Sequence, residues 1–273
     1  MRKPLFLISL VLSSTACSPT GDAGEDGGAV EGVAATPTRV AAQPDEAKAF
    51  AFTDNAERGD GNREFAYSWP EAVAREAGLV DLLDREREAA LAEQEADWDQ
   101  SFADVPEGCV SCISRGYEKE WKVVADLPRW LSLSADLYVY TGGAHGTYGR
   151  TSLVWDREGK KAIEGIEMFK SPVALETALG AQLCDALDRS RAKRRGAPVE
   201  RTSEWGSDCP GIDEAAVFVG SSNGETFDRI GVYFGPYVAG SYAEGAHELN
   251  FPVTASVLDA VKPEYAETFS VKR

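Results

Sequence analysis

The chain has 273 residues, and its 28 Lys and Arg residues against 45 Asp and Glu residues give a formal net charge of −17 at pH 7. That balance argues against a nucleic-acid partner, because phosphate backbones bind positively charged surfaces, and it disfavours direct adsorption to an anionic membrane surface. A cationic partner would be attracted to such a chain, although an acidic surface can also simply keep a secreted protein soluble.

The N-terminus indicates export and lipidation. Residues 1–4 form a short basic segment, and residues 5–12 form an apolar run that is too short to span a bilayer. Small residues then lead to Cys17, an arrangement that resembles the lipobox of bacterial lipoproteins. We therefore expect residues 1–16 to be a lipoprotein signal peptide and Cys17 to be lipidated, with palmitate among its acyl groups, as a membrane anchor. The alternative is an ordinary secretory signal with a fortuitous cysteine.

Lipidation would place the protein in the bacterial cell envelope. By resemblance to Gram-negative lipoproteins, Ser18 rather than an aspartate after the cysteine favours the outer membrane, with the protein facing the periplasm. The segment 17–49 consists of this cysteine followed mainly by Gly, Ala, Pro, Thr and acidic residues with no apolar period. Such a segment buries too little surface to fold, so we expect a flexible tether with a reach of about 30 Å. The alternative is a recognition segment that folds on binding.

The first half of the globular region is predicted to combine strands with one long helix. Residues 64–69 alternate large aromatic residues with smaller ones, which indicates a strand. Residues 71–100 are rich in Ala, Leu, Glu and Arg and predict a helix with a break at Gly78. The clearest strand is 131–140, where apolar and polar residues alternate strictly. We expect it to form a hairpin with residues 118–126.

The second half is predicted to hold another hairpin, a long helix and three more strands. Residues 151–155 and 162–166 flank a turn sequence. Ser171 and Pro172 then start a helix whose leucines recur on one face, and we interpret the basic residues near its end as a solvated helix terminus. These residues are Leu175, Leu179, Leu183 and Leu187, followed by Arg189, Arg191, Lys193, Arg194 and Arg195. Residues 215–219, 230–234 and 247–253 are predicted as strands, and residues 255–261 as a short helix.

Strands and helices mix without a regular βαβ repeat, so the predicted class is α+β. We expect antiparallel sheets with helices packed on one side, in two small subdomains, residues 50–149 and 150–273. Four cysteines follow the lipidated one, and their even number in an oxidising compartment predicts disulfides. We favour Cys109 with Cys112, which are constrained to be neighbours, and Cys184 with Cys209. A redox-active Cys-Val-Ser-Cys site and a four-cysteine zinc site are the alternatives.

Three stretches in the same order resemble a known family. They are residues 131–145, which contain Tyr-Thr-Gly-Gly-Ala-His, the helix 171–187, and Tyr-Phe-Gly-Pro-Tyr at 233–237 followed by Tyr-Ala-Glu-Gly-Ala at 242–246. This order resembles the secreted portion of the RsiV and PdaC proteins, whose N-terminal part is the domain of unknown function 4163 and whose C-terminal part is the domain of unknown function 3298. The resemblance implies an α+β envelope domain without an agreed catalytic residue. In RsiV that portion senses lysozyme.

The chain's only two histidines occur in the same Tyr-x-x-Gly-Ala-His sequence, at residues 140–145 and 242–247. If both turns close one sheet edge, their aromatic side chains converge on a shared surface, and a metal or acid–base centre is conceivable there. A structural turn with polar caps is the simpler interpretation. The residues that we single out as ligand-binding candidates are Tyr140, Gly142, Gly143, His145, Tyr148, Tyr237, Tyr242 and His247.

We therefore expect a non-enzymatic, lipid-anchored envelope protein without a metal or cofactor. Its ligand is expected to be a protein or glycan, with a lysozyme-like muramidase or peptidoglycan as the partners to test. The alternative is a peptidoglycan-directed hydrolase or metal-dependent enzyme that uses His145 and His247.

Overall fold

The computed structural model describes residues 48–103 and 105–272. The expected signal peptide, the lipidation at Cys17 and the tether up to residue 47 lie outside these residues. Within them, no helix combines the length and the apolar character that are needed to cross a bilayer. Two sheets and several helices form an α+β fold, as the sequence predicts.

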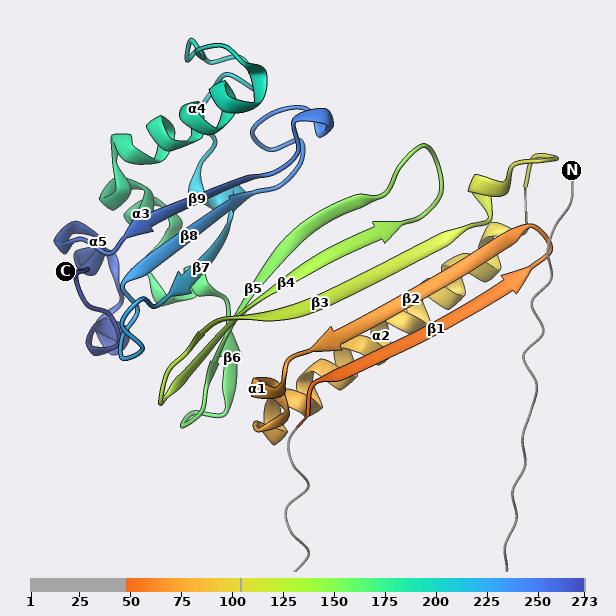
Figure 1. Ribbon diagram of the computed structural model, residues 1–273, viewed down its shortest axis with the longest axis horizontal. Coiled ribbons are helices and arrows are strands. Elements are labelled where there is room, and N and C mark those ends of the chain that lie inside the picture. The colour runs from red at the N-terminus through yellow and green to blue at the C-terminus, as the bar shows by residue number, and fades with distance from the viewer. Residues whose placement is uncertain (1–47, 104, 273) are drawn as a thin grey trace, which may run out of the picture. The chain divides into compact units, whose positions relative to one another are not determined.

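The first sheet has six strands in chain order, and every neighbouring pair is antiparallel except β2 and β3, which are parallel (Figure 1). Its strands are β1 (Phe50–Arg58), β2 (Gly61–Trp69), β3 (Arg115–Asp126), β4 (Trp130–Tyr140), β5 (Thr147–Asp156) and β6 (Lys161–Ile163). The hairpins expected between β3 and β4 and between β5 and β6 both form. Strand β1 was not predicted from the sequence. The division expected at residue 150 falls inside β5.

A helix packs along one face of this sheet. The helical segment is α1 (Glu71–Ala74) and α2 (Ala77–Ser101), and α2 runs behind β1 to β3 in Figure 1. Large aromatic side chains dominate the core between them, including Phe65, Tyr67 and Trp155. The helix breaks at Arg75–Glu76 rather than at Gly78 as expected. Gly78 lies within α2. A β-carbon at this position would lie 3.1 Å from the Trp155 ring, so the glycine allows the helix to pack close to that ring.

The polar second half of α2 also faces the sheet. Three cations of the sheet, Arg63, Arg115 and Lys119, are buried, and each pairs with an acidic residue of α2. Burial of a charge is costly unless it is paired, so these ion pairs explain how a polar helix surface can cover a sheet. Because successive side chains of a strand point to opposite faces, the side chains that do not face α2 lie on the opposite, open face of the sheet.

One detail of β3 differs from the expected alternation. Strict alternation along β3 would place Val123 on the same buried face as Trp121 and Ala125, but Val123 is 43% exposed. The pairing register with β4 shifts between Val123 and Ala125, so a β-bulge interrupts the alternation directly after Val123.

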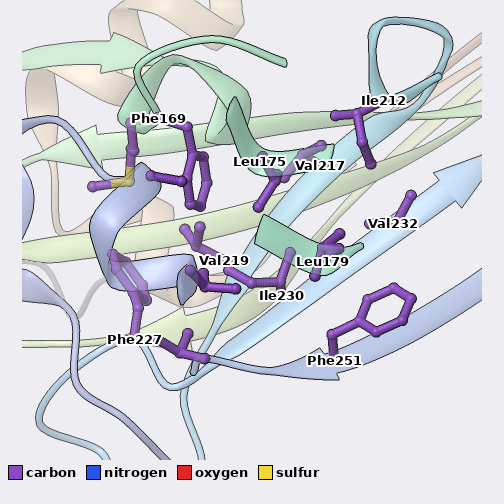
Figure 2. Packing of buried hydrophobic residues seen from close by; sticks show 14 of the residues in the cluster. Phe169, Leu175, Leu179, Ile212, Val217, Val219, Phe227, Ile230, Val232 and Phe251 are labelled. Carbon is purple, nitrogen blue, oxygen red and sulfur yellow. The ribbon is translucent and has the colours of Figure 1, made fainter. Parts of the chain in front are cut away.

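The second sheet has three antiparallel strands, β7 (Ala216–Gly220), β8 (Arg229–Phe234) and β9 (His247–Pro252), in that order. Helices α3 (Pro172–Leu179), α4 (Ala181–Arg195) and α5 (Ala255–Ala260) contribute to an aliphatic and phenylalanine core with it. Figure 2 shows Leu175 and Leu179 among Val217, Ile230 and other side chains of this core. Short 3₁₀ helices complete the fold: η1 (Val110–Cys112), η2 (Gly165–Met168), η3 (Ile212–Glu214), η4 (Tyr242–Glu244) and η5 (Pro263–Thr268).

The long helix expected after Ser171 is interrupted. The Ser171 side chain accepts a hydrogen bond from the Ala174 amide and caps α3. Gly180 then has φ +56 and separates α3 from α4. All four leucines of the predicted stripe are buried nonetheless.

Candidate functional site

The two turns with the Tyr-x-x-Gly-Ala-His sequence meet. The β4–β5 and β8–β9 connections that carry them lie in the upper part of Figure 1. The His145 imidazole stacks on the Tyr242 ring with 3.9 Å between ring centroids. The Tyr242 hydroxyl donates a hydrogen bond of 2.8 Å to the Gly146 carbonyl oxygen. The turns therefore build one surface from segments about a hundred positions apart in the chain.

Aromatic side chains extend this surface on both sides of Tyr242. Tyr148 packs edge-on against Tyr242 at 5.8 Å, and Tyr237 lies 5.6 Å from it on the other side. Next to Tyr237, Trp205 donates a hydrogen bond from its indole nitrogen to the Tyr237 carbonyl oxygen. We call this set the aromatic face: His145, Tyr148, Trp205, Tyr237 and Tyr242.

The aromatic face is open to solvent. Trp205 is 60% exposed and Tyr237 is 50% exposed, and His145 is exposed as well, while Tyr148 and Tyr242 are half-buried. Tyr237 also has φ +69, which is uncommon for a residue other than glycine. Contiguous exposed aromatic rings and a strained backbone are features of binding surfaces rather than of cores.

A buried arginine of α4 holds the loops that carry Trp205 and Tyr237. Arg191 has no exposed surface, and its guanidinium donates hydrogen bonds to the carbonyl oxygens of Ala239 and Asp208. Burial lowers the pKa of Arg191, a cost that the nearby Asp188 carboxylate partly offsets. The interpretation of the whole basic run as a solvated helix terminus is therefore wrong for Arg191.

The next two arginines of the run hold the second turn. Arg194 donates hydrogen bonds to the carbonyl oxygens of Glu244 and Ala246. Arg195 pairs with the Glu244 carboxylate at 2.9 Å and donates to the Gly206 carbonyl oxygen at 2.6 Å. The end of α4 thus holds two connections, the one between α4 and η3, which carries Trp205, and the one between β8 and β9, which carries Tyr237 and Tyr242.

Two disulfides join the cysteine pairs that the sequence favoured. The bond between Cys184 and Cys209 links α4 to the loop that follows Trp205. The bond between Cys109 and Cys112 closes a short loop that borders the first turn. There, the Tyr140 hydroxyl donates to the Gly143 carbonyl oxygen at 2.8 Å and to the Ser111 carbonyl oxygen at 3.4 Å.

The glycines of the first turn have backbone conformations that favour glycine. Gly142 and Gly143 have φ +101 and +92. A β-carbon on Gly142 would lie 2.9 Å from the Ser111 carbonyl oxygen, whereas one on Gly143 would have nothing within 4 Å. Tyr140 and Gly142 therefore shape the turn against the Cys109–Cys112 loop, and Tyr140 makes no ring contact with the aromatic face among the residues that the structure covers.

His247 has an environment opposite to that of His145. It has no exposed surface, and its Nδ1 lies 2.9 Å from the Ser190 hydroxyl. Its Nε2 has no hydrogen-bond partner, and the Glu244 carboxylate lies 3.9 Å away. Burial, together with the charges of Arg194 and Arg191, lowers the pKa of His247 to about 4. The imidazole is therefore neutral at pH 7.

An acidic cleft of about 600 Å³ adjoins the aromatic face. Its floor is the open face of β3, β4 and β5, and its wall comes from β8, β9 and the second turn. The charged lining consists of five carboxylates and two guanidinium groups: Glu118, Glu120, Asp136, Glu244 and Glu248, with Arg150 and Arg194. Tyr138, Tyr148 and Tyr233 add aromatic surface, and burial raises the pKa of Tyr233 to about 12.

The structure thus brings together His145, Tyr148, Tyr237 and Tyr242 among the residues singled out from the sequence. Gly142, Gly143 and Tyr140 support the first turn, and His247 lies beneath the second. In the part of the chain that the structure describes, no group of three or more His, Cys, Asp or Glu side chains is placed to hold a metal ion.

Sequence reasoning missed Trp205, Arg191 and Glu118. Trp205 lies in a polar Ser-Glu-Trp-Gly-Ser sequence, where it has no apolar neighbour to pack against, and that isolation was a usable signal. Arg191 continues the four-residue spacing of the buried leucines, which ends with Leu187, so its burial also had a signal. No local sequence pattern pointed to Glu118, because the residues around it come from neighbouring strands.

No protein-family model matches the chain, and no curated protein matches its sequence. Among the solved structures that are similar to it, two are of proteins of the DUF3298 family. One, from Pseudomonas aeruginosa PAO1, is 19% identical, with 84% of this chain and 99% of that chain covered and a TM-score of 0.44. The other, from Bacteroides fragilis, is 15% identical, with 81% of this chain and 95% of that chain covered and a TM-score of 0.44.

Proposed function

We propose that this protein is a lipid-anchored component of the bacterial cell envelope that binds a protein or glycan ligand through its aromatic face, without catalysing a reaction. The observation that carries the proposal is the exposed grouping of Trp205, Tyr237, Tyr242 and His145. Such rings supply contact area and hydrogen bonds at a small entropic cost, as in the centres of protein interfaces.

Charge favours a cationic protein as the ligand. The net charge of −17 attracts such a partner over a distance, and the acidic cleft lies directly beside the aromatic face. A lysozyme-like muramidase fits this description, and the resemblance of residues 131–145, 171–187, 233–237 and 242–246 to RsiV points to the same class of partner. By the same resemblance, residues 50–149 would correspond to the domain of unknown function 4163 and residues 150–273 to the domain of unknown function 3298.

The anchor and the location belong to the same proposal. Cys17 would be lipidated and, once residues 1–16 are removed, would be the first residue of the mature chain, and the protein would face the periplasm from the outer membrane. Incorporation of labelled palmitate by the wild type but not by Cys17→Ala, together with membrane fractionation, tests this part. Labelling of the variant, or recovery of the wild type in the soluble periplasmic fraction, would contradict it.

Calorimetric titration of residues 18–273 with lysozyme tests the binding part, at low salt and at physiological salt. We expect binding that weakens as salt rises, because screening reduces charge attraction. Substitution of Trp205 by Ala should weaken it at least tenfold, about the effect of losing an interface hot spot. Absence of binding at both salt concentrations would remove lysozyme as the ligand. Turnover of purified cell wall that disappears in His145→Ala would favour the hydrolase alternative instead.

A further inference from the structure

The floor of the acidic cleft is a row of cross-strand neighbours. Glu118 of β3 lies opposite Tyr138 of β4, and Tyr138 lies opposite Tyr148 of β5. Side chains at such paired positions on one face of a sheet lie side by side. A carboxylate and two phenol rings therefore stand next to one another on the open face of the sheet.

Glu118 differs from the other carboxylates of the cleft in its charge balance. Glu120 pairs with Lys122 at 2.7 Å, and Glu248 pairs with Arg150 at 2.8 Å. Asp136 contacts both of these cations, and Glu244 pairs with Arg195. No cation of residues 48–103 or 105–272 pairs with Glu118, and it is exposed to solvent.

The hollow continues beyond Glu118. A second depression of about 230 Å³, bordered by β1 and β2, shares Glu118 and Tyr138 with the acidic cleft. The open surface therefore passes on both sides of this carboxylate. That form suits an extended segment of polypeptide that crosses the strands better than it suits a small isolated ligand.

We infer that Glu118, Tyr138 and Tyr148 form a subsite for one lysine or arginine side chain of a partner protein. The cationic group would lie against the Glu118 carboxylate, and its aliphatic stem would cover the Tyr138 ring. A cation over a phenol ring is attracted by the ring electrons, and the unpaired carboxylate adds a full charge. This inference rests on the proposed function, because the side chain belongs to the cationic ligand that the aromatic face binds.

The inference is tested with the peptide acetyl-Gly-Gly-Lys-Gly-Gly-amide, titrated into residues 18–273 and followed by nuclear magnetic resonance. We expect shifts at Glu118, Tyr138 and Tyr148, and no binding of the same peptide with an acetylated lysine. An arginine version distinguishes guanidinium from ammonium. Equal binding of the acetylated peptide, or shifts confined to other residues, would overturn the subsite.

Two pairs of variants sharpen this test. Glu118→Gln should weaken binding of the peptide about fivefold. Glu264→Gln, an equal charge change at an exposed residue of η5, should not weaken it. Tyr138→Leu should weaken it and Tyr138→Phe should retain it, since phenylalanine keeps the ring. Unchanged thermal unfolding of Glu118→Gln shows that its fold is intact. Equal effects of the two glutamine variants would refute a specific role for Glu118.

The outcome separates the subsite from the function on which it rests. If lysozyme binds and Trp205→Ala weakens it, while Glu118→Gln changes neither ligand, the proposed function stands and the subsite fails. If the lysine peptide binds at Glu118 and lysozyme does not bind at all, the subsite stands and lysozyme is the wrong partner.

Discussion

The two turns of this protein share the sequence Tyr-x-x-Gly-Ala-His, yet their residues exchange roles. In the first turn Tyr140 is tied to backbone carbonyls and His145 is exposed. In the second turn Tyr242 belongs to the aromatic face and His247 is completely buried. The same six-residue pattern therefore supplies an exposed imidazole in one place and a core imidazole in the other.

The position of each histidine relative to the next strand explains the difference. His247 is the first residue of β9, whose side chains alternate between buried and exposed from that residue onward. His145 lies two residues before β5 begins, outside the hydrogen-bonded ladder. A local sequence pattern can indicate a turn, but the register of the adjoining strand decides which side chain faces the core.

The largest expected effect concerns the two disulfides, one beside the first turn and one beside Trp205. Replacing Cys184 and Cys209 by Ala should lower the free energy of unfolding by about 3 kcal/mol, because the bond closes a long loop. Replacing Cys109 and Cys112 by Ala should cost about 2 kcal/mol, because only two residues separate that pair. Urea unfolding of both double variants measures this. Equal losses, or a reversed order, would contradict the chain-entropy argument.

The next effect separates the two histidines by pH. The pKa of His247 is about 4 in the folded protein, below the ordinary value of 6.5, so the unfolded chain binds more protons between these values. Stability should therefore fall as pH falls through this window, by about 2 kcal/mol from pH 7 to pH 5. His247→Gln should remove that part of the pH dependence, and His145→Gln should retain it.

Urea unfolding of the three proteins at both pH values provides the measurement. If His247→Gln lost as much stability as the wild type on acidification, the buried imidazole would not be the responsible group. Should His145→Gln also flatten the profile, the contrast between the turns would be lost.

A smaller effect concerns the glycines of the first turn. Gly143→Ala should cost about 1 kcal/mol, because alanine is strained at φ +92 although space is free around it. Gly142→Ala should cost about twice as much, since its β-carbon also approaches the Ser111 carbonyl oxygen. Thermal unfolding compares the two variants. A larger loss of stability in Gly143→Ala than in Gly142→Ala would contradict the argument from the Ser111 contact.

Much of the fold was predictable because it depends on local pattern. The alternation in β4, the cap at Ser171 and the leucine stripe of α3 and α4 each gave an element close to its observed place. Strand β1 was missed because only Phe50 and Phe52 show its alternation before the residues turn polar. Its pairing with β2, rather than its own composition, makes it a strand.

The site was less predictable, because its parts meet only in three dimensions. The shared histidine sequence pointed to both turns, but nothing local indicated that His145 would stack on Tyr242. The contribution of Trp205 depends on a hydrogen bond to Tyr237 and on the Cys184–Cys209 bond beside it. In the described part of the chain, Glu118 is unpaired because the cations nearby, Lys122 and Arg150, pair with other carboxylates of the cleft, and the sequence does not show these pairings.

The central claim is that the aromatic face binds the ligand and that the buried histidine only supports it. Calorimetric titration with lysozyme at low salt, on folded wild type, His145→Ala and His247→Gln, tests it most directly. We predict an affinity loss of about tenfold for His145→Ala with little change in stability, and an unchanged affinity for folded His247→Gln. Equal affinities for the wild type and His145→Ala, or a loss only in His247→Gln, would contradict the account.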